Sequence, residues 1–85
     1  MSERTHIELI TALKILDLTI TGWASGLKKP GGEVGISRTA VTQVAKGIDD
    51  TQWIKDEIKA VISKAKSKNP EYFETETQFL LSKSA

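Results

Sequence analysis

The sequence predicts a small all-α protein of four to five helices. Apolar residues recur with helical spacing in residues 9–16, 41–44 and 54–65, as expected for helices that bury one face. Residue types that favour helix starts precede these stretches, and Gly or Pro follows two of them. A chain of 85 residues holds one domain, so the helices must share a single core.

Two helix starts are predicted in the first third of the chain. Thr5 opens the pattern Thr-x-x-Glu of a capping box, which places the start of the first helix there. The apolar stripe of this helix consists of Leu9, Leu13 and Leu16, widened by Ile10. Thr19 can cap a short second helix that contains Gly22 and Gly26, and each glycine weakens that helix by about 1 kcal/mol relative to Ala. Packing of Trp23 must therefore support it.

The third helix is the best delimited element. Residues 28–35 contain three glycines and one proline and predict an exposed turn before it. Ser37 is a favourable N-cap, and Val41 and Val44 lie on one face. Gly47 suits the left-handed residue that ends many helices.

The C-terminal third contains a fourth helix and a tail. Residues 49–52, Asp-Asp-Thr-Gln, begin the fourth helix, with either aspartate as its cap. Its apolar stripe is Ile54, Ile58, Val61, Ile62 and Ala65. Pro70 ends it, and residues 70–85 then fit either a further helix or a strand. We therefore divide the chain into a body, residues 1–69, and a tail, residues 70–85.

The composition argues against several classes of function. With no cysteine, and with His6 as the only histidine, we expect no metal site. His6 has no titratable neighbour at a spacing typical of catalysis, so we expect a surface histidine and no enzymatic activity. The Pro-Gly-Gly segment lacks the Gly-Lys-Ser/Thr ending of a phosphate-binding loop, and we expect no cofactor or small-molecule substrate. No stretch suits a membrane span or a cleaved leader, which predicts a cytoplasmic protein.

The net charge of +1 hides an asymmetry. Residues 1–68 carry eleven basic and eight acidic side chains, a sum of +3, and residues 69–85 carry one and three, a sum of −2. A basic body with an acidic tail suits a nucleic-acid partner. Chains this short also show such differences by chance, so the charge alone does not decide.

The third helix offers residue types that read DNA on the face opposite its valines. We predict DNA contacts from Ser37, Arg38, Thr39, Thr42, Gln43 and Lys46. Arg38 can pair with guanine or a phosphate, Gln43 with adenine, and the threonines with a thymine methyl group, while Lys46 suits a phosphate. Any amphipathic helix of a soluble protein also has a polar outer face, so composition alone leaves both interpretations open.

Order and spacing favour the DNA interpretation. An ordered series of features in residues 10–47 resembles the lambda-repressor-like, or Xre-type, helix-turn-helix family: Ile10 and Leu13, Leu18-Thr19, Trp23-Ala24 with Leu27, Gly35-Ile36-Ser37, Val41 with Val44, and Gly47. The resemblance covers about half of the chain, and residues 35–47 are its specific part. It implies a helix-turn-helix DNA-binding domain in residues 1–69.

Two departures from the family pattern bear on this interface. The family joins its second and third helices by a short turn, whereas residues 28–34 form a Gly-rich insertion here. The position after the cap Thr19, where the family often places a phosphate-contacting Gln, is Ile20. Lys28 and Lys29 in the insertion can supply that contact, and a solvated loop is the alternative explanation of both lysines.

The resemblance implies a sequence-specific transcriptional regulator, a Cro-like repressor of phage or mobile-element type, that binds the major groove of double-stranded DNA. One helix covers only a few base pairs, so we expect a homodimer on an inverted-repeat operator. We predict that the dimer contact is made by the apolar residues of the tail, Tyr72, Phe73, Phe79, Leu80 and Leu81. The alternative is that these residues cover the core of their own body. The alternative function is a protein-interaction module on the same scaffold, such as a phage antirepressor or an inhibitor of a host factor.

Overall fold

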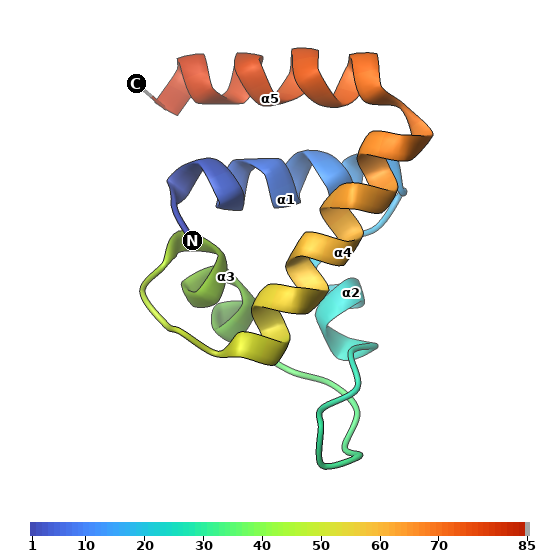
Figure 1. Ribbon diagram of the computed structural model, residues 1–85, viewed down its shortest axis with the longest axis vertical. Helices are drawn as coiled ribbons and strands as arrows, with labels where there is room; N and C mark the ends of the chain where they lie inside the picture. The colour runs from blue at the N-terminus through green and yellow to red at the C-terminus, as the bar shows by residue number, and fades with distance from the viewer. Residues whose placement is uncertain (85) are drawn as a thin grey trace.

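The computed structural model describes residues 1–84, and within them the chain forms five α-helices and no named strand (Figure 1). The helices are α1 (Glu3–Ile15), α2 (Ile20–Ser25), α3 (Arg38–Lys46), α4 (Gln52–Lys68) and α5 (Pro70–Ser84). The predicted all-α class is confirmed. The tail, for which a helix and a strand were both open, is a helix.

α1 lies at the centre of the molecule and contacts each of the other four helices. Leu9 and Leu13 are buried on α1, and they share one core cluster with Val41 of α3, Ile58 of α4 and Phe73 of α5. With Ala24 of α2 in the same cluster, residues from all five helices complete a single core, which agrees with the expectation for a chain of this length.

The caps of α2 and α3 form where the sequence places them. The hydroxyl oxygen of Thr19 accepts a hydrogen bond from the Gly22 amide at 3.0 Å. Ser37 Oγ accepts one from the Ala40 amide at 3.1 Å, and Gly47 ends α3 with a φ of 89°. The bounds of these helices follow from local chemistry, because a cap needs only its own next turn.

The predicted starts of α1 and α4 are wrong in detail. α1 begins at Glu3 with Ser2 as its N-cap, and Ser2 Oγ accepts from the Thr5 amide at 3.4 Å, so Thr5 lies inside the helix. α4 has Thr51 as its N-cap without a side-chain hydrogen bond. The Asp49 carboxylate accepts instead from the amide of Asp50 at 2.7 Å. That local turn competes with the capping role.

α5 packs antiparallel to α1 and on the side of α1 away from α3 (Figure 1). Two buried threonines join the pair, since Thr77 Oγ1 lies 3.3 Å from Thr11 Oγ1. Lys14 Nζ also lies 3.0 Å from Glu76 Oε1. Within the described residues, α5 has no contact with α2 or α3, so the helix α3 and the tail occupy opposite ends of the molecule.

The Gly-rich insertion forms a hairpin that projects from the body beyond α2 (Figure 1). The amide of Gly35 donates to the Leu27 carbonyl at 2.7 Å, and the Lys29 amide donates to the Glu33 carbonyl at 2.7 Å. Gly32 has a φ of 95° near the tip, a conformation that glycine adopts without strain. The predicted exposed turn is thus an ordered hairpin.

Candidate nucleic-acid interface

The polar face of α3 borders a shallow hollow of about 330 Å³. The side chains around it are His6, Arg38, Thr39, Thr42, Gln43 and Lys46. Five of the six residues of this helix region that the sequence predicts for DNA contact therefore share one concave surface, and the sixth, Ser37, is exposed at the helix start, where it serves as the cap.

The opposite face of α3 is anchored completely. Val41, Val44 and Ala45 are buried without measurable exposure, and α3 contacts α1, α2 and α4. The backbone entering α3 is also tied down, because the Ile36 amide donates to the Ala24 carbonyl of α2 at 3.0 Å. The packing therefore directs the polar side chains of α3 outward from a rigid element, as a reading surface requires.

The electrostatics of the hollow suit an anionic ligand. Arg38 and Lys46 stand at the two ends of α3, and none of the side chains that line the hollow is a carboxylate. The nearest acid that contacts a lining residue is Glu3, whose Oε1 lies 3.5 Å from His6 Nδ1. Two cations separated by uncharged polar groups are the arrangement in which phosphate contacts flank base contacts.

His6 is a residue of this surface that the sequence analysis missed. It comes from α1, its side chain is only 14% exposed, and its Nδ1 is shielded from solvent and has no hydrogen-bond partner within the described residues. His6 precedes Leu9 by three residues and Leu13 by seven, so all three lie on one face of the helix. That spacing is the signal that places His6 beside α3.

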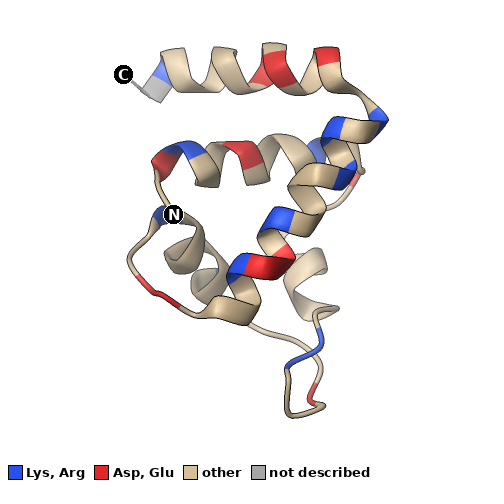
Figure 2. Ribbon diagram, viewed as in Figure 1, with Lys and Arg blue, Asp and Glu red and all other residues tan. Residues whose placement is uncertain are grey.

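The hairpin lysines do not line the α3 hollow. Lys29 Nζ pairs with Glu33 Oε2 at 3.5 Å on the same hairpin, whereas Lys28 is exposed. Figure 2 shows these charges on the projecting hairpin, apart from the other charged residues of the body. Residues 26–37 separate α2 from α3, so the short turn of the resembled family is absent, as the sequence indicates.

An acidic loop follows α3. Asp49 and Asp50 are exposed, and Asp50 forms an ion pair with Lys55. Ile48 beside them is 73% exposed. A phosphate approaching this loop would meet like charge, so an anionic ligand is favoured at the hollow, which Arg38 and Lys46 line, and not at the loop.

The predicted dimer residues divide between core and surface. Phe73 is 2% exposed and belongs to the core of its own chain, so for this residue the alternative role, covering the body, is the one observed. Tyr72 and Phe79 are exposed, and Leu80 and Leu81 are half-buried. The exposed aromatics thus remain the surface candidates on α5.

None of the helices in residues 1–84 combines the length and apolar character that a membrane span needs. In the same part of the chain, no three His, Asp or Glu side chains are grouped so as to hold a metal ion. Comparison with protein families, with curated proteins and with solved structures finds no match for this chain.

Proposed function

We propose that this protein is a sequence-specific regulator that binds double-stranded DNA through α3, in the manner of a lambda-repressor-like helix-turn-helix protein. The observation that carries the proposal is the division of α3. Its apolar side is fully buried, while its polar side borders a hollow lined by two cations, three uncharged polar residues and a histidine. A major groove admits one helix, and such side chains match the edges of its base pairs.

Each polar residue has a role that its position supports. Arg38 is exposed at the start of α3, where it can form a bidentate pair with guanine, and Gln43 can do the same with adenine. Thr39 and Thr42 offer methyl groups to thymine. Lys46, beside the C-terminal end, contacts a phosphate and fixes the register of the helix.

The protein acts as a homodimer, because one helix reads only a few base pairs and two copies on an inverted repeat double the contacted sequence. The exposed aromatics of α5 lie at the end of the molecule away from α3. A dimer contact there leaves both copies of α3 uncovered. Bound upstream of a gene, such a dimer represses by occupying the DNA.

Lys28 supplies a flanking phosphate contact, and Lys29 contributes less because Glu33 already pairs with it. The hairpin therefore replaces, from another position, the phosphate contact that Ile20 cannot make. Contacts of this kind position a protein without reading sequence.

The test is selection of binding sites from random duplex DNA, followed by affinity measurements on the selected and on unrelated sequences. The double variant Arg38→Ala with Gln43→Ala should lose discrimination, since each bidentate pair is worth about 1–3 kcal/mol, and should keep weak nonspecific binding. The matched control is Lys64→Ala with Gln78→Ala, which removes the same types of charge and amide from exposed positions of α4 and α5. Selection of the same site by the Arg38/Gln43 double variant would contradict the assignment of α3.

The second candidate is a protein-interaction module, such as an antirepressor or an inhibitor of a host factor. The acidic loop after α3 and the exposed Ile48 favour it, since apolar side chains beside carboxylates suit a protein surface better than DNA. Salt separates the two candidates. DNA binding through several phosphates should weaken on the order of a hundredfold between low and physiological salt, whereas an apolar protein contact should change little.

A further inference from the structure

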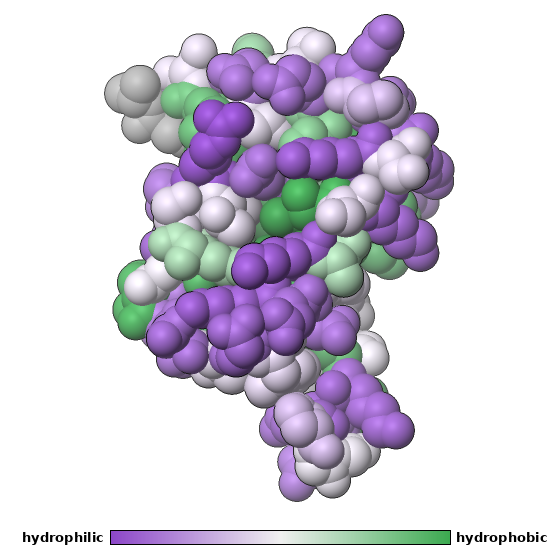
Figure 3. All heavy atoms as spheres, in the orientation of Figure 1, coloured by the Kyte–Doolittle hydropathy of each residue, from purple (hydrophilic) through white to green (hydrophobic). Residues whose placement is uncertain are grey.

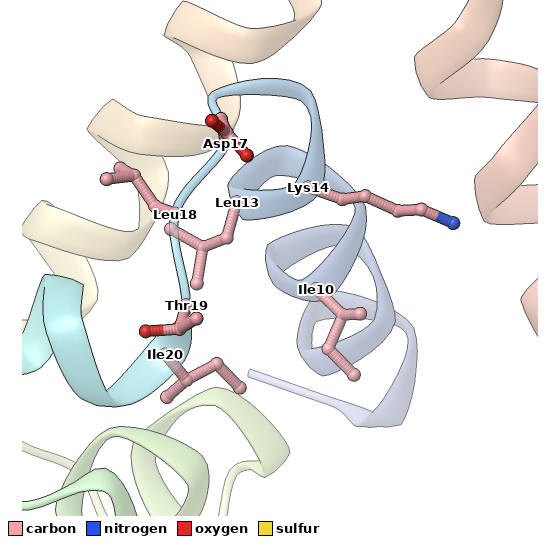
Figure 4. A pocket seen from close by; sticks show the side chains of 7 residues that line it. All are labelled: Ile10, Leu13, Lys14, Asp17, Leu18, Thr19 and Ile20. Carbon is pink, nitrogen blue, oxygen red and sulfur yellow. The ribbon is translucent and has the colours of Figure 1, made fainter.

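A second hollow lies between the C-terminal half of α1 and the start of α2, and the proposed DNA contacts do not use it (Figure 4). Its volume is about 380 Å³. Four aliphatic side chains, one hydroxyl and two charged side chains line it: Ile10, Leu13, Leu18, Ile20, Thr19, Lys14 and Asp17. The hollow is therefore mainly apolar with charge at its rim.

The turn after α1 creates this hollow. Asp17 has a φ of 58°, a left-handed conformation that Asp tolerates better than most residues. The Leu18 amide donates to the Leu13 carbonyl at 2.8 Å, which closes the turn. Leu18 emerges 44% exposed at the edge of the hollow rather than inside the core, so part of an apolar side chain remains in water.

An apolar projection lies on the neighbouring helix. Phe79 of α5 is 53% exposed, and Lys83 Nζ lies 4.9 Å from the centroid of its ring. A cation at this distance from a ring is held electrostatically. Phe79 with Lys83 is thus an aromatic side chain that carries a positive charge over its face.

The projection and the hollow lie on adjoining elements. Lys14 lines the hollow, and its Nζ lies 3.0 Å from Glu76 Oε1 of α5. Figure 4 shows the Lys14 side chain extending away from the other lining residues and toward the neighbouring helix. Glu76 precedes Phe79 by three residues and therefore shares its side of α5.

We propose that this face pairs two copies of the chain, with Phe79 of each copy in the α1–α2 hollow of the other and Lys83 against Asp17. The proposal rests on the proposed function in that it names the contacts of the proposed homodimer. A two-fold axis between projection and hollow makes the same contact twice. Both Phe79 side chains and both Leu18 side chains are then removed from water.

Charge complementarity identifies a second copy as the occupant. Of the two rim charges, Lys14 is already paired with Glu76, and Asp17 has no ion pair among the described residues. The hollow therefore presents one unpaired negative charge beside aliphatic walls. The same chain presents an aromatic ring with a cation over its face, which is the complement of that surface.

Sedimentation equilibrium of the full chain without DNA tests the proposal. The wild type should show a concentration-dependent dimer. Phe79→Ala should weaken it by roughly thirtyfold or more, because a buried aromatic anchor is lost from each of two contacts. The matched control Gln78→Ala changes an exposed neighbour on another side of α5 and should leave the dimer unchanged. Far-ultraviolet circular dichroism establishes that each variant keeps its helices.

A double-mutant cycle tests the proposed charge pair. Asp17→Asn keeps a residue that tolerates the left-handed conformation, and Lys83→Gln removes the cation. Each single change should weaken the dimer several-fold. The dimer of the double variant should be no weaker than the less stable of the two single-variant dimers. If the loss of dimer affinity in the double variant equals the product of the two single losses, the two residues are not paired.

Two further outcomes overturn the proposed interface, namely a wild type that stays monomeric at all concentrations and a Phe79→Ala variant that dimerises like the wild type. Binding of a different protein by a chain that stays monomeric would also overturn the proposed interface. None of these measurements involves DNA. Failure of the dimer contact is therefore distinguishable from failure of DNA binding, which the site selection with the Arg38/Gln43 variant examines separately.

Discussion

α3 and α5 are both amphipathic helices at opposite ends of one core, yet they divide their surfaces differently. The buried side of α3 is entirely aliphatic, and its outer side is polar. The buried side of α5 includes Phe73 and the hydroxyl of Thr77, while Phe79, on the flank that it shares with Glu76, is 53% exposed. This difference indicates two kinds of partner, because a polar outer face suits a charged ligand and an exposed aromatic suits another apolar surface.

The largest expected effect is a difference in folding stability between alanine variants of the two phenylalanines of α5. Phe73→Ala should destabilise the fold by about 3–5 kcal/mol, since it leaves a cavity in the core. Phe79→Ala should change the stability of the monomer by less than about 1 kcal/mol, because its ring is half in water. Urea unfolding at a protein concentration too low for dimers measures both. Equal losses would show that the two sides of α5 do not differ as described.

A smaller loss of stability is expected when the side chains that cap the starts of the two helices are removed. Ser37→Ala removes the acceptor of the 3.1 Å bond from Ala40 and should cost about 1 kcal/mol. Asn69→Ala removes the acceptor of a longer bond, 3.4 Å from the Tyr72 amide, and should cost less because the bond is weaker. Thermal unfolding without DNA ranks the two variants. The reverse order would mean that α5 depends on its cap more than α3 does.

The smallest effect concerns the ion pair that holds α5 on α1. The hydrogen bond from Lys14 to Glu76 raises the pKa of Lys14 above its ordinary value of 10.5, with a further contribution from Tyr72. A raised lysine pKa stabilises the fold fully below the unfolded value, and this contribution disappears as the pH rises through the folded value. Both groups are partly solvated, so the stabilisation is small.

Glu76→Gln should therefore lower stability slightly at neutral pH and make no difference well above the ordinary lysine pKa. Chemical unfolding at both pH values measures this. Glu71→Gln, which removes an exposed acid from the first turn of the same helix, is the matched control and should show no such loss of effect at high pH. A Glu76→Gln effect that persists at high pH would contradict the role of Lys14.

Much of the fold could be predicted because its signals are local. Thr19, Ser37 and Gly47 each act within one turn of their own helix, and the buried positions of α4 follow a simple helical period. The polar residues of α3 could be grouped for the same reason, because one helix carries them all. Prediction failed where two local solutions compete, as at the start of α1, where Ser2 rather than Thr5 is the cap. It also failed at Asp49, where the side chain closes its own loop.

The sequence by itself determined the all-α class, most helix bounds and the outer face of α3, because caps and periodicity depend on residues within a few positions of one another. The tertiary structure decided the rest. It made the tail a helix by burying Phe73 and Thr77 against α1, and it brought His6 into the α3 hollow. Both outcomes depend on contacts between residues far apart in the chain, and only the assembled core determines which of those contacts form.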